Sequence, residues 1–314
     1  MRAIVTGGAG FIGSHLADRL IREGWSVLVL DNLSSGYLRN VPKDAQFKWL
    51  DMTQEDSITQ LPKDGVDVVF HLASHVGQGL SFERPIYDFK ANAFSTLLLL
   101  KWCLEKEVKQ FIFASSMNVY GDPPETLVTE QTPVNPPSPY SVGKIASEYL
   151  CNIYQHFGIN TTSLRLFNVY GPRQDMQNMK QGMVSIFMTF VARKEPVFVR
   201  GSKDRFRDFI YVDDVVDVFM RCMDKKAYGK VYNVSTGKKT YIWQLIKDII
   251  TAFGYDPEKY PVSYGESTPR DQFGIYGDSS LLQNDLGWRP KVELKNGLIE
   301  MAEWVKKYGN IWER

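Results

Sequence analysis

The sequence predicts an α/β fold in which helices cover both faces of a parallel sheet, together with a smaller C-terminal α/β domain. Short apolar runs alternate with longer amphipathic segments through the first half of the chain. This alternation is typical of parallel sheets, whose strands are buried on both faces. A glycine-rich turn follows the first apolar run, and after about residue 170 the strands become shorter and turns more frequent. We expect one domain over residues 1–170 and a second over residues 171–314, with a soft boundary and interleaved segments.

The expected strands are nearly all apolar, and the expected helices carry an apolar stripe. The strands cover residues 3–6, 27–30, 66–72, 111–115 and 162–167, and the helices cover residues 15–23, 87–107 and 141–157. In the last helix, Ile145, Tyr149 and Ile153 fall on one stripe at i, i+4 and i+8. The proline-rich segment 133–139 cannot continue a helix and ends just before Tyr140.

The composition excludes several classes of protein. The chain has 314 residues, of which 44% are hydrophobic, and its 37 Lys and Arg nearly balance its 36 Asp and Glu. Nucleic-acid and membrane partners usually require a basic excess, so we expect neither. Cys103, Cys151 and Cys222 form no CxxC pair, so we expect no disulfide framework and no metal site. No apolar run approaches the roughly 20 residues of a membrane span, and we expect a cytoplasmic protein.

The glycine-rich turn indicates a dinucleotide site. Gly8, Gly10 and Gly13 satisfy G-x-G-x-x-G, and Gly7, Gly10 and Gly13 satisfy the related G-x-x-G-x-x-G, between a predicted strand and a predicted helix. Glycines let a pyrophosphate approach bare backbone at the helix N-terminus. This context predicts a Rossmann-type doubly wound sheet. Asp31 ends the second strand, 31 − 13 = 18 residues after the last glycine, where an acid binds the adenosine ribose and disfavours NADP, so the expected cofactor is NAD.

Two Tyr-x-x-x-Lys pairs are candidates for proton-transfer chemistry. Tyr140 and Lys144 open a predicted helix, where the i, i+4 spacing places them on one face, whereas Tyr255 and Lys259 flank a Pro-containing turn. A free tyrosine has a pKa near 10, and a nearby cation lowers it. The alternative for Tyr140 and Lys144 is an ordinary surface pair. Ser116 follows a strand end, where ligands bind in open α/β sheets, although a serine there can also lack a chemical role.

Several motifs together resemble a known family. They are TGGAGFIG, Asp31-Asn32-Leu33, Asp51-Met52, His71-Leu72-Ala73, Asn92, SSMNVYGD, PYSVGK, RLFNVYGPR at 165–173, RDFIYVDD at 207–214 and LGWRP at 286–290. In this order they resemble the extended short-chain dehydrogenase/reductases, and within them the NAD-dependent sugar-nucleotide epimerase/dehydratase branch typified by UDP-glucose 4-epimerase. The resemblance runs to about residue 300.

The resemblance implies a role for each matching residue. Tyr140 is the implied base, Lys144 holds the nicotinamide ribose and lowers the tyrosine pKa, and Ser116 binds the reacting 4-hydroxyl. The implied NAD-binding residues are Gly7, Gly10, Phe11, Ile12, Gly13, Asp31, Asn32, Asp51, Met52, Leu72, Ala73 and Asn92, together with Tyr140 and Lys144. The implied binding residues for a nucleotide sugar, most simply a UDP-sugar, are Ser116, Met117, Asn118, Tyr140, Asn168, Arg207, Arg270 and Ile275.

The family's reactions all begin by oxidising the sugar at its 4-position. Related dehydratases carry Asp-Glu after the catalytic Ser or Thr, related decarboxylases an acid, and 3,5-epimerases a Cys, whereas this chain has Met117 and Asn118. Elimination favours a 4-epimerase of UDP-glucose and UDP-galactose or their N-acetyl forms. A dehydratase or decarboxylase with an unusual site, a net oxidoreductase and a non-catalytic NAD-binding scaffold are the alternatives.

Three further expectations concern the second domain and assembly. The basic cluster Arg200, Lys203, Arg205 and Arg207 is either a solvated loop or, at Arg207, a diphosphate contact. The absence of a large aromatic residue at Ile275 would admit N-acetyl sugars. By family resemblance, the helices at 87–107 and 141–157 pair in a homodimer.

Overall fold

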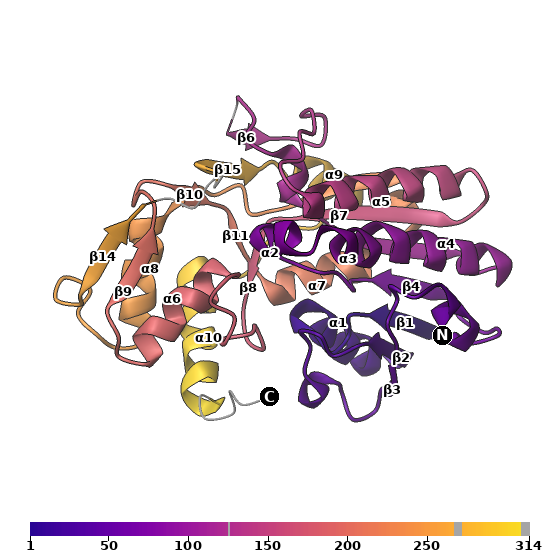
Figure 1. Ribbon diagram of the computed structural model, residues 1–314, viewed down its shortest axis with the longest axis horizontal. Helices are drawn as coiled ribbons and strands as arrows, with labels where there is room; N and C mark the ends of the chain where they lie inside the picture. Colours follow the sequence, from indigo (N-terminus) through magenta and orange to yellow (C-terminus); the bar gives the residue numbers. More distant parts are fainter. Residues whose placement is uncertain (125, 267–271, 309–314) are drawn as a thin grey trace.

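A seven-stranded parallel sheet forms the larger part of the described molecule (Figure 1). The computed structural model describes residues 1–124, 126–266 and 272–308. The strands follow the order β12-β7-β5-β4-β1-β2-β3. Their bounds are β1 (Arg2–Thr6), β2 (Ser26–Asp31), β3 (Gln46–Trp49), β4 (Val68–His71), β5 (Gln110–Ser116), β7 (Asn160–Leu166) and β12 (Lys230–Val234). The order reverses between β1 and β4, which confirms the doubly wound sheet and creates the crevice where such folds bind ligands.

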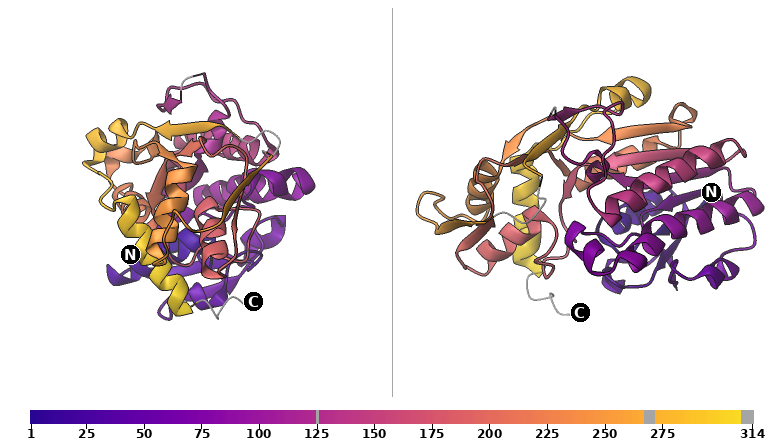
Figure 2. Two further views of the ribbon diagram at one scale, coloured as in Figure 1. Left: turned by 90° about the vertical axis from the view of Figure 1, so that its left-hand side faces the viewer. Right: turned by 45° about the horizontal axis from the view of Figure 1, so that its top comes forward.

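Helices cover both faces of this sheet (Figure 2). On one face, α4 (Ser95–Glu105) and α5 (Pro139–Gln155) bury Leu99, Phe113 and Cys151 in one apolar cluster. On the other, α1 (Phe11–Arg22) packs against α7 (Val212–Arg221), and the core there includes Leu16 and Val215. The apolar strands predicted from the sequence are thus buried from both sides.

Two elements differ from the sequence prediction. Strand β3 was not predicted because it lies at the sheet edge, where its alternate polar residues remain partly exposed. The single helix expected over residues 87–107 is divided into α3 (Pro85–Phe89), a π-helical turn (Lys90–Phe94) and α4. Turns of this type often mark functional sites, and this one carries Asn92.

Most of the remaining elements form the smaller part, seen at the left of Figure 1. One sheet has the order β13-β10-β15-β6, and the pairs β11-β8 and β14-β9 form two-stranded sheets. The strands are β6 (Leu127–Val128), β8 (Asn168–Tyr170), β9 (Val197–Arg200), β10 (Phe206–Arg207), β11 (Phe209–Tyr211), β13 (Thr240–Tyr241), β14 (Val262–Gly265) and β15 (Gly274–Gly277). The helices of this part are α6 (Met183–Ala192), α8 (Ile242–Ala252) and α10 (Leu294–Tyr308). Two further helices lie beside the large sheet: α2 (Gln78–Glu83), which precedes α3, and α9 (Ser280–Leu286), which contacts β12.

Segments cross between the two parts in both directions. Strand β12 and helix α7 follow residue 171 in the chain but complete the large sheet and its cover. Strand β6 precedes residue 170 but pairs with β15 in the smaller part. The interleaving that we expected around residues 170 and 171 is therefore present in the strands. The assignment of one function to each part stays a prediction. Among the described helices, none is both long and apolar enough to cross a bilayer.

A buried carboxylate joins the two parts beside the sheet edge. Asp208 is fully buried and accepts hydrogen bonds from Thr236 N (3.0 Å), Thr236 Oγ1 (2.6 Å), Gly237 N (2.9 Å) and Gly277 N (3.3 Å). Its carbonyl also accepts from Asn168 N (3.1 Å) and Nδ2 (3.0 Å). Asp208 thereby ties the start of β8 to β15 and to the turn after β12.

We expect Asp208→Ala to lower the free energy of unfolding by about 3 kcal/mol, because it leaves several buried donors unpaired. Chemical denaturation followed by circular dichroism measures this change. The exposed Asp44→Ala is the matched control and should change the free energy of unfolding by less than about 0.5 kcal/mol. Equal effects of the two substitutions would contradict the role given to Asp208.

Candidate functional site

The predicted site residues of the first half gather at the carboxyl ends of β1, β4 and β5. The glycine turn follows β1, Leu72 and Ala73 follow β4, and Ser116 ends β5. Thr6 links the first two strand ends: its Oγ1 bonds His71 Nδ1 at 2.7 Å and accepts from Ala73 N at 3.1 Å. The predicted cofactor residues and the predicted catalytic residues therefore line one edge of the sheet.

The glycine turn is a cradle of bare backbone. Gly7 has φ +69°, and a Cβ there would come within 2.7 Å of Ala73 N. A Cβ on Gly13 would overlap the Gly7 carbonyl. Helix α1 begins at Phe11 with Gly10 as its N-cap, which has no side chain to cover the N–H groups of Phe11 and Ile12. Such a cradle at a helix N-terminus fits the pyrophosphate of a dinucleotide.

Asp31 closes this cradle from strand β2. Its carboxylate accepts hydrogen bonds from Ala9 N at 3.0 Å and Leu33 N at 2.8 Å. Burial raises the pKa of this carboxyl, and the two backbone donors oppose that shift. Asn32 follows, with its Nδ2 donating to the Tyr87 hydroxyl at 3.4 Å. The fixed carboxylate at a strand end is suited to two adjacent hydroxyls of a ribose.

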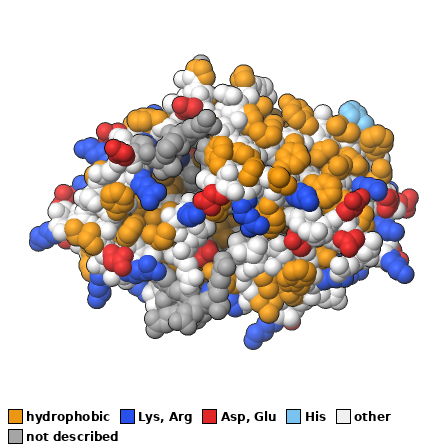
Figure 3. Space-filling view, viewed as in Figure 1, with side chains coloured by type: hydrophobic (Ala, Val, Ile, Leu, Met, Phe, Trp, Pro, Cys, Tyr) orange, Lys and Arg blue, Asp and Glu red, His pale blue; other side chains and the backbone are white. Residues whose placement is uncertain are grey.

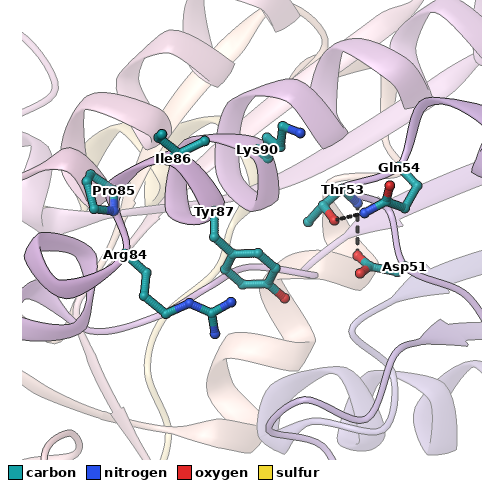
Figure 4. Close-up of a pocket in the computed structure, with 8 residues that line it drawn as sticks. All are labelled: Asp51, Thr53, Gln54, Arg84, Pro85, Ile86, Tyr87 and Lys90. Atoms are coloured by element: carbon teal, nitrogen blue, oxygen red, sulfur yellow. Dashed lines mark hydrogen bonds between the residues drawn. The ribbon is translucent and has the colours of Figure 1, made fainter.

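A pocket of about 460 Å³ lies between Asp51 and helix α3 (Figure 4). The Tyr87 ring lies between Arg84, whose guanidinium carbon is 4.4 Å from the ring centroid, and Asp51 (Figure 4). The other lining residues are Thr53, Gln54, Pro85, Ile86 and Lys90. Asp51 bonds Thr53 N at 3.0 Å, whereas Met52 is buried in the core. Of this predicted pair, only Asp51 lines the pocket.

Asn92 organises a polar cluster at the π-helical turn. It accepts from Ser74 Oγ at 2.5 Å and donates to the His75 carbonyl at 3.1 Å and to Asp88 Oδ1 at 3.1 Å. Asp88 is fully buried and lies 2.8 Å from His75 Nδ1. A Cβ on Gly143 would come within 2.8 Å of Asn92 Cβ, so α5 packs closely here. His75 and Asp88 were not predicted, because neither belongs to a recognisable motif.

Helix α5 carries the predicted tyrosine and lysine on its inner face. It starts with a capping box between Ser138 and Ser141 and with Pro139 in its first turn, which fixes where Tyr140 begins the helix. Lys144 Nζ donates to the Ala114 carbonyl at 2.9 Å and lies 5.7 Å from the Tyr140 ring centroid. Tyr140 and the Ser116 hydroxyl share a hydrogen bond. The structure thus brings Ser116, Tyr140 and Lys144 together, whereas Tyr255 and Lys259 lie in the loop after α8.

Burial dominates the electrostatics of this triad. It raises the pKa of Tyr140 to about 12, while the bond to Ser116 lowers it and the charge of Asp88 raises it further. Burial also lowers the pKa of Lys144 to about 7, against the opposing charges of Asp88 and Glu148. Without a further cation the tyrosine stays protonated at neutral pH. The site therefore needs added positive charge before Tyr140 can act as a base.

The predicted residues of the sugar side lie next to Ser116. Asn118 N donates to Ser116 Oγ at 3.2 Å, and Asn168 Nδ2 donates to Met117 Sδ at 3.6 Å. Met117 and the fully buried Ile275 belong to one apolar cluster, which also contains Phe167. These side chains form a buried apolar cluster beside the end of β5.

Arg207 pairs with Ile275 in the register of β10 and β15. Its guanidinium donates to the carbonyls of Phe206 (2.8 Å), Phe273 (3.1 Å) and Gln272 (2.6 Å). Burial, and next the charge of Arg205, lower its pKa to about 10, so it keeps its positive charge at neutral pH. The predicted Arg270 lies outside the described residues.

Comparison with known proteins agrees with this geometry. Residues 3–235 match the model of the NAD dependent epimerase/dehydratase family. A putative UDP-glucose 4-epimerase of Methanocaldococcus jannaschii is 34% identical over 96% of this chain and 98% of its own. The UDP-glucose 4-epimerase of Thermotoga maritima, solved with UDP-glucose, is 37% identical, with a TM-score of 0.92 over 98% of this chain and 99% of its own.

A second similar structure is that of an epimerase for an N-acetylated sugar in place of glucose. The UDP-N-acetylglucosamine 4-epimerase of Methanobrevibacter ruminantium M1, in complex with UDP-N-acetylmuramic acid, is 30% identical, with a TM-score of 0.90 over 98% of each chain. The family match spans well over half of the chain and includes the glycine cradle, Ser116, Tyr140 and Lys144. The chain therefore belongs to the NAD dependent epimerase/dehydratase family.

Proposed function

We propose that this protein is a UDP-sugar 4-epimerase that uses bound NAD and a transient 4-keto sugar. One observation carries the proposal: Ser116, Tyr140 and Lys144 meet at the strand end beside the glycine cradle, with no carboxylate at Met117 or Asn118. When bound, NAD supplies reversible hydride acceptance. The relatives named above as UDP-glucose 4-epimerases support the choice of reaction.

In this proposal, Tyr140 is the base. The Lys144 ammonium, 5.7 Å from the tyrosine ring, favours the phenolate, and so does the positive charge of an oxidised nicotinamide. The phenolate removes the proton of the sugar 4-hydroxyl, while Ser116 donates to and accepts from the same oxygen. After the keto sugar rotates, Tyr140 returns the proton to that oxygen. No proton is lost in the cycle, and the two epimers interconvert.

The residues beside Ser116 favour epimerisation over dehydration. A dehydratase must remove a carbon-bound proton and protonate a leaving hydroxyl, which needs an acid and a base near the sugar. Met117 and Asn118 supply neither. The carboxylates that act electrostatically on Lys144 are both engaged, Asp88 with His75 and Asn92 and Glu148 with Arg165. The same residues Ser116, Tyr140 and Lys144 argue against a non-catalytic scaffold.

We further propose how the two ligands are held. Asp31 binds the adenosine ribose, the glycine turn binds the pyrophosphate of NAD, and Arg207 with Asn168 binds the diphosphate of the sugar. Backbone carbonyls hold the Arg207 guanidinium, which fixes the position of its charge. A cytoplasmic location fits the three buried free cysteines.

We also propose that the protein is a homodimer through α4 and α5. Hydrophobic side chains gather over these helices (Figure 3). Tyr149, Ile153 and Phe157 on α5 and the turn after it are 60%, 49% and 62% exposed, and Leu97 and Leu104 on α4 are also exposed. An exposed apolar face of this kind is typical of a subunit interface.

Tyr140→Phe should lower turnover by roughly 10²- to 10⁴-fold, because it removes the proposed general base. The rate of interconversion of UDP-glucose and UDP-galactose is the measurement, made on protein with a full complement of bound NAD. Tyr255→Phe, in the second Tyr-x-x-x-Lys pair, is the matched control and should leave the rate unchanged. Near-normal turnover of Tyr140→Phe would refute the assignment.

The sugar specificity follows from the aliphatic side chain at Ile275. A buried isoleucine leaves more room than an aromatic ring, so we expect UDP-N-acetylglucosamine to be converted as well as UDP-glucose. Incubation of the NAD-loaded protein with UDP-glucose, UDP-N-acetylglucosamine, UDP-glucuronate and dTDP-glucose, followed by NMR of the anomeric protons, separates the reactions. Failure with the acetylated sugar would contradict this specificity, and a 4-keto-6-deoxy product would contradict epimerisation.

The dimer is tested by charging its exposed face. Tyr149→Asp combined with Ile153→Asp should convert a dimer into a monomer, because two carboxylates would be desolvated in the interface. Sedimentation velocity at micromolar concentration gives the mass. Phe198→Asp, an equally exposed position on β9, is the control and should remain dimeric. A monomeric parent protein would exclude the proposed interface.

A further inference from the structure

Glu148 is a buried carboxylate one helical turn beyond Lys144. Tyr140, Lys144 and Glu148 follow each other at i, i+4 and i+8 along α5, and all three are buried. The proposed reaction uses the first two and leaves Glu148 without a part. Carboxylates are rarely buried to this extent unless they are paired, so its partners indicate what it does.

Glu148 holds the end of strand β5. Ser115, the neighbour of Ser116, donates from Oγ to Glu148 Oε1 at 2.5 Å. Arg165, which faces Ser115 across β5 and β7, donates from Nε to Oε1 at 3.0 Å and from Nη2 to Oε2 at 2.7 Å. Both carboxylate oxygens are therefore fixed by strand residues. This bidentate arrangement is the geometry that makes an Arg–carboxylate pair rigid.

Arg165 extends the same contact to the turn after Ser116. Its Nη1 donates to the Tyr120 hydroxyl at 2.9 Å, and that hydroxyl donates to Asn233 Oδ1 at 2.6 Å. Tyr120 ends the short 3₁₀ turn Met117–Tyr120, whose N-cap is Ser116. One buried network thus connects the helix that carries Tyr140 and Lys144 to the turn that carries Ser116 and Met117.

The network also bears on the charge of Lys144. The ionisable groups that influence Lys144 are Asp88 from α3 and Glu148 from α5, which both favour its charged form. His71 from β4 also faces it but is held neutral, because burial lowers its pKa to about 3, and Tyr140 lies on the same helix. Burial alone disfavours the ammonium. The two carboxylates therefore oppose the loss of charge that burial favours at Lys144.

We propose that Glu148 is a positioning residue whose carboxylate keeps Lys144 charged and, through Ser115 and Arg165, fixes the strand end that carries Ser116. The inference rests on the proposed function, since it gives Glu148 a part in the same reaction. Glu148 acts through Lys144 and Ser116 and touches no reacting atom. The competing view is a buried ion pair that only holds α5 against β5 and β7, without any effect on the charge of Lys144.

The two views predict different titrations of Lys144. Lysine carrying ¹³C at Cε gives an NMR signal whose shift follows protonation, and comparison with Lys144→Met assigns it. This measurement needs neither substrate nor bound NAD. In Glu148→Gln the Lys144 midpoint should fall by about one pH unit from the value of about 7, because an opposite charge nearby is lost.

Three companion variants make the result interpretable. Glu148→Gln leaves the charge of Arg165 buried without its partner. Glu148→Gln combined with Arg165→Gln, the neutral pair, removes both charges and so avoids this unpaired charge. The Lys144 midpoint of the neutral pair should also fall. Glu148→Asp keeps the charge and should restore the midpoint. Glu130→Gln changes another carboxylate of the same neighbourhood, which accepts from Asn233 N at 2.7 Å but does not act on Lys144, and should leave the midpoint unchanged.

The kinetic counterpart is the pH dependence of epimerisation. Relative to the parent protein, the neutral pair should lose activity about ninefold one pH unit above the parent's Lys144 midpoint and only about twofold one unit below it, because the ammonium is depleted earlier. An unshifted Lys144 midpoint in the neutral pair, or an activity loss equal at both pH values, would overturn the inference. A shifted midpoint in a protein without epimerase activity would support charge control by Glu148 and overturn the proposed function instead.

Discussion

The hydrogen bond from the Lys144 ammonium to the Ala114 carbonyl fixes the position of the site. It joins the inner face of α5 to the end of β5 at 2.9 Å, within a region from which water is excluded. A buried ammonium is costly unless it is hydrogen-bonded and matched by opposite charge. Asp88 and Glu148 supply the opposite charge, from α3 and from α5. The hydrogen bond from Lys144 to Ala114 also holds α5 against β5, and Tyr140 and Ser116 lie beside each other at this contact.

The sheet order explains why residues distant in sequence share this place. Parallel strands all end at one edge, and the reversal between β1 and β4 opens that edge for a ligand. The glycine cradle, Asp31 and the cluster around Asn92 surround the opening, while Asn168 and Arg207 approach from the smaller part. The cluster of Met117, Phe167 and Ile275 is apolar, which suits a site where the keto sugar must rotate without being held rigidly by hydrogen bonds.

The parts of the fold that were predictable from sequence are those with strong local signals. Runs of strand length identified β1, β2, β4, β5 and β7, and the glycines with Asp31 identified the dinucleotide site. Strand β3 was not predicted because an edge strand needs no apolar pattern. The π-helical turn was not predicted because its neighbours are ordinary helix formers. The pairing of Glu148 with Arg165 and of His75 with Asp88 depends on distant segments meeting in three dimensions. A charged residue inside a strand of the central sheet, as at Arg165, was the available signal for a buried partner.

The exchange of strands between the two parts also constrains how the chain is made. Strand β12, at residues 230–234, pairs with β7 and completes the large sheet. During synthesis one edge of β7 therefore stays unpaired until the intervening residues have emerged. Six of the seven residues of that strand are buried in the finished protein. A strand with an open edge readily pairs with another chain. The nascent chain is therefore exposed to aggregation through this edge between the synthesis of β7 and the synthesis of β12.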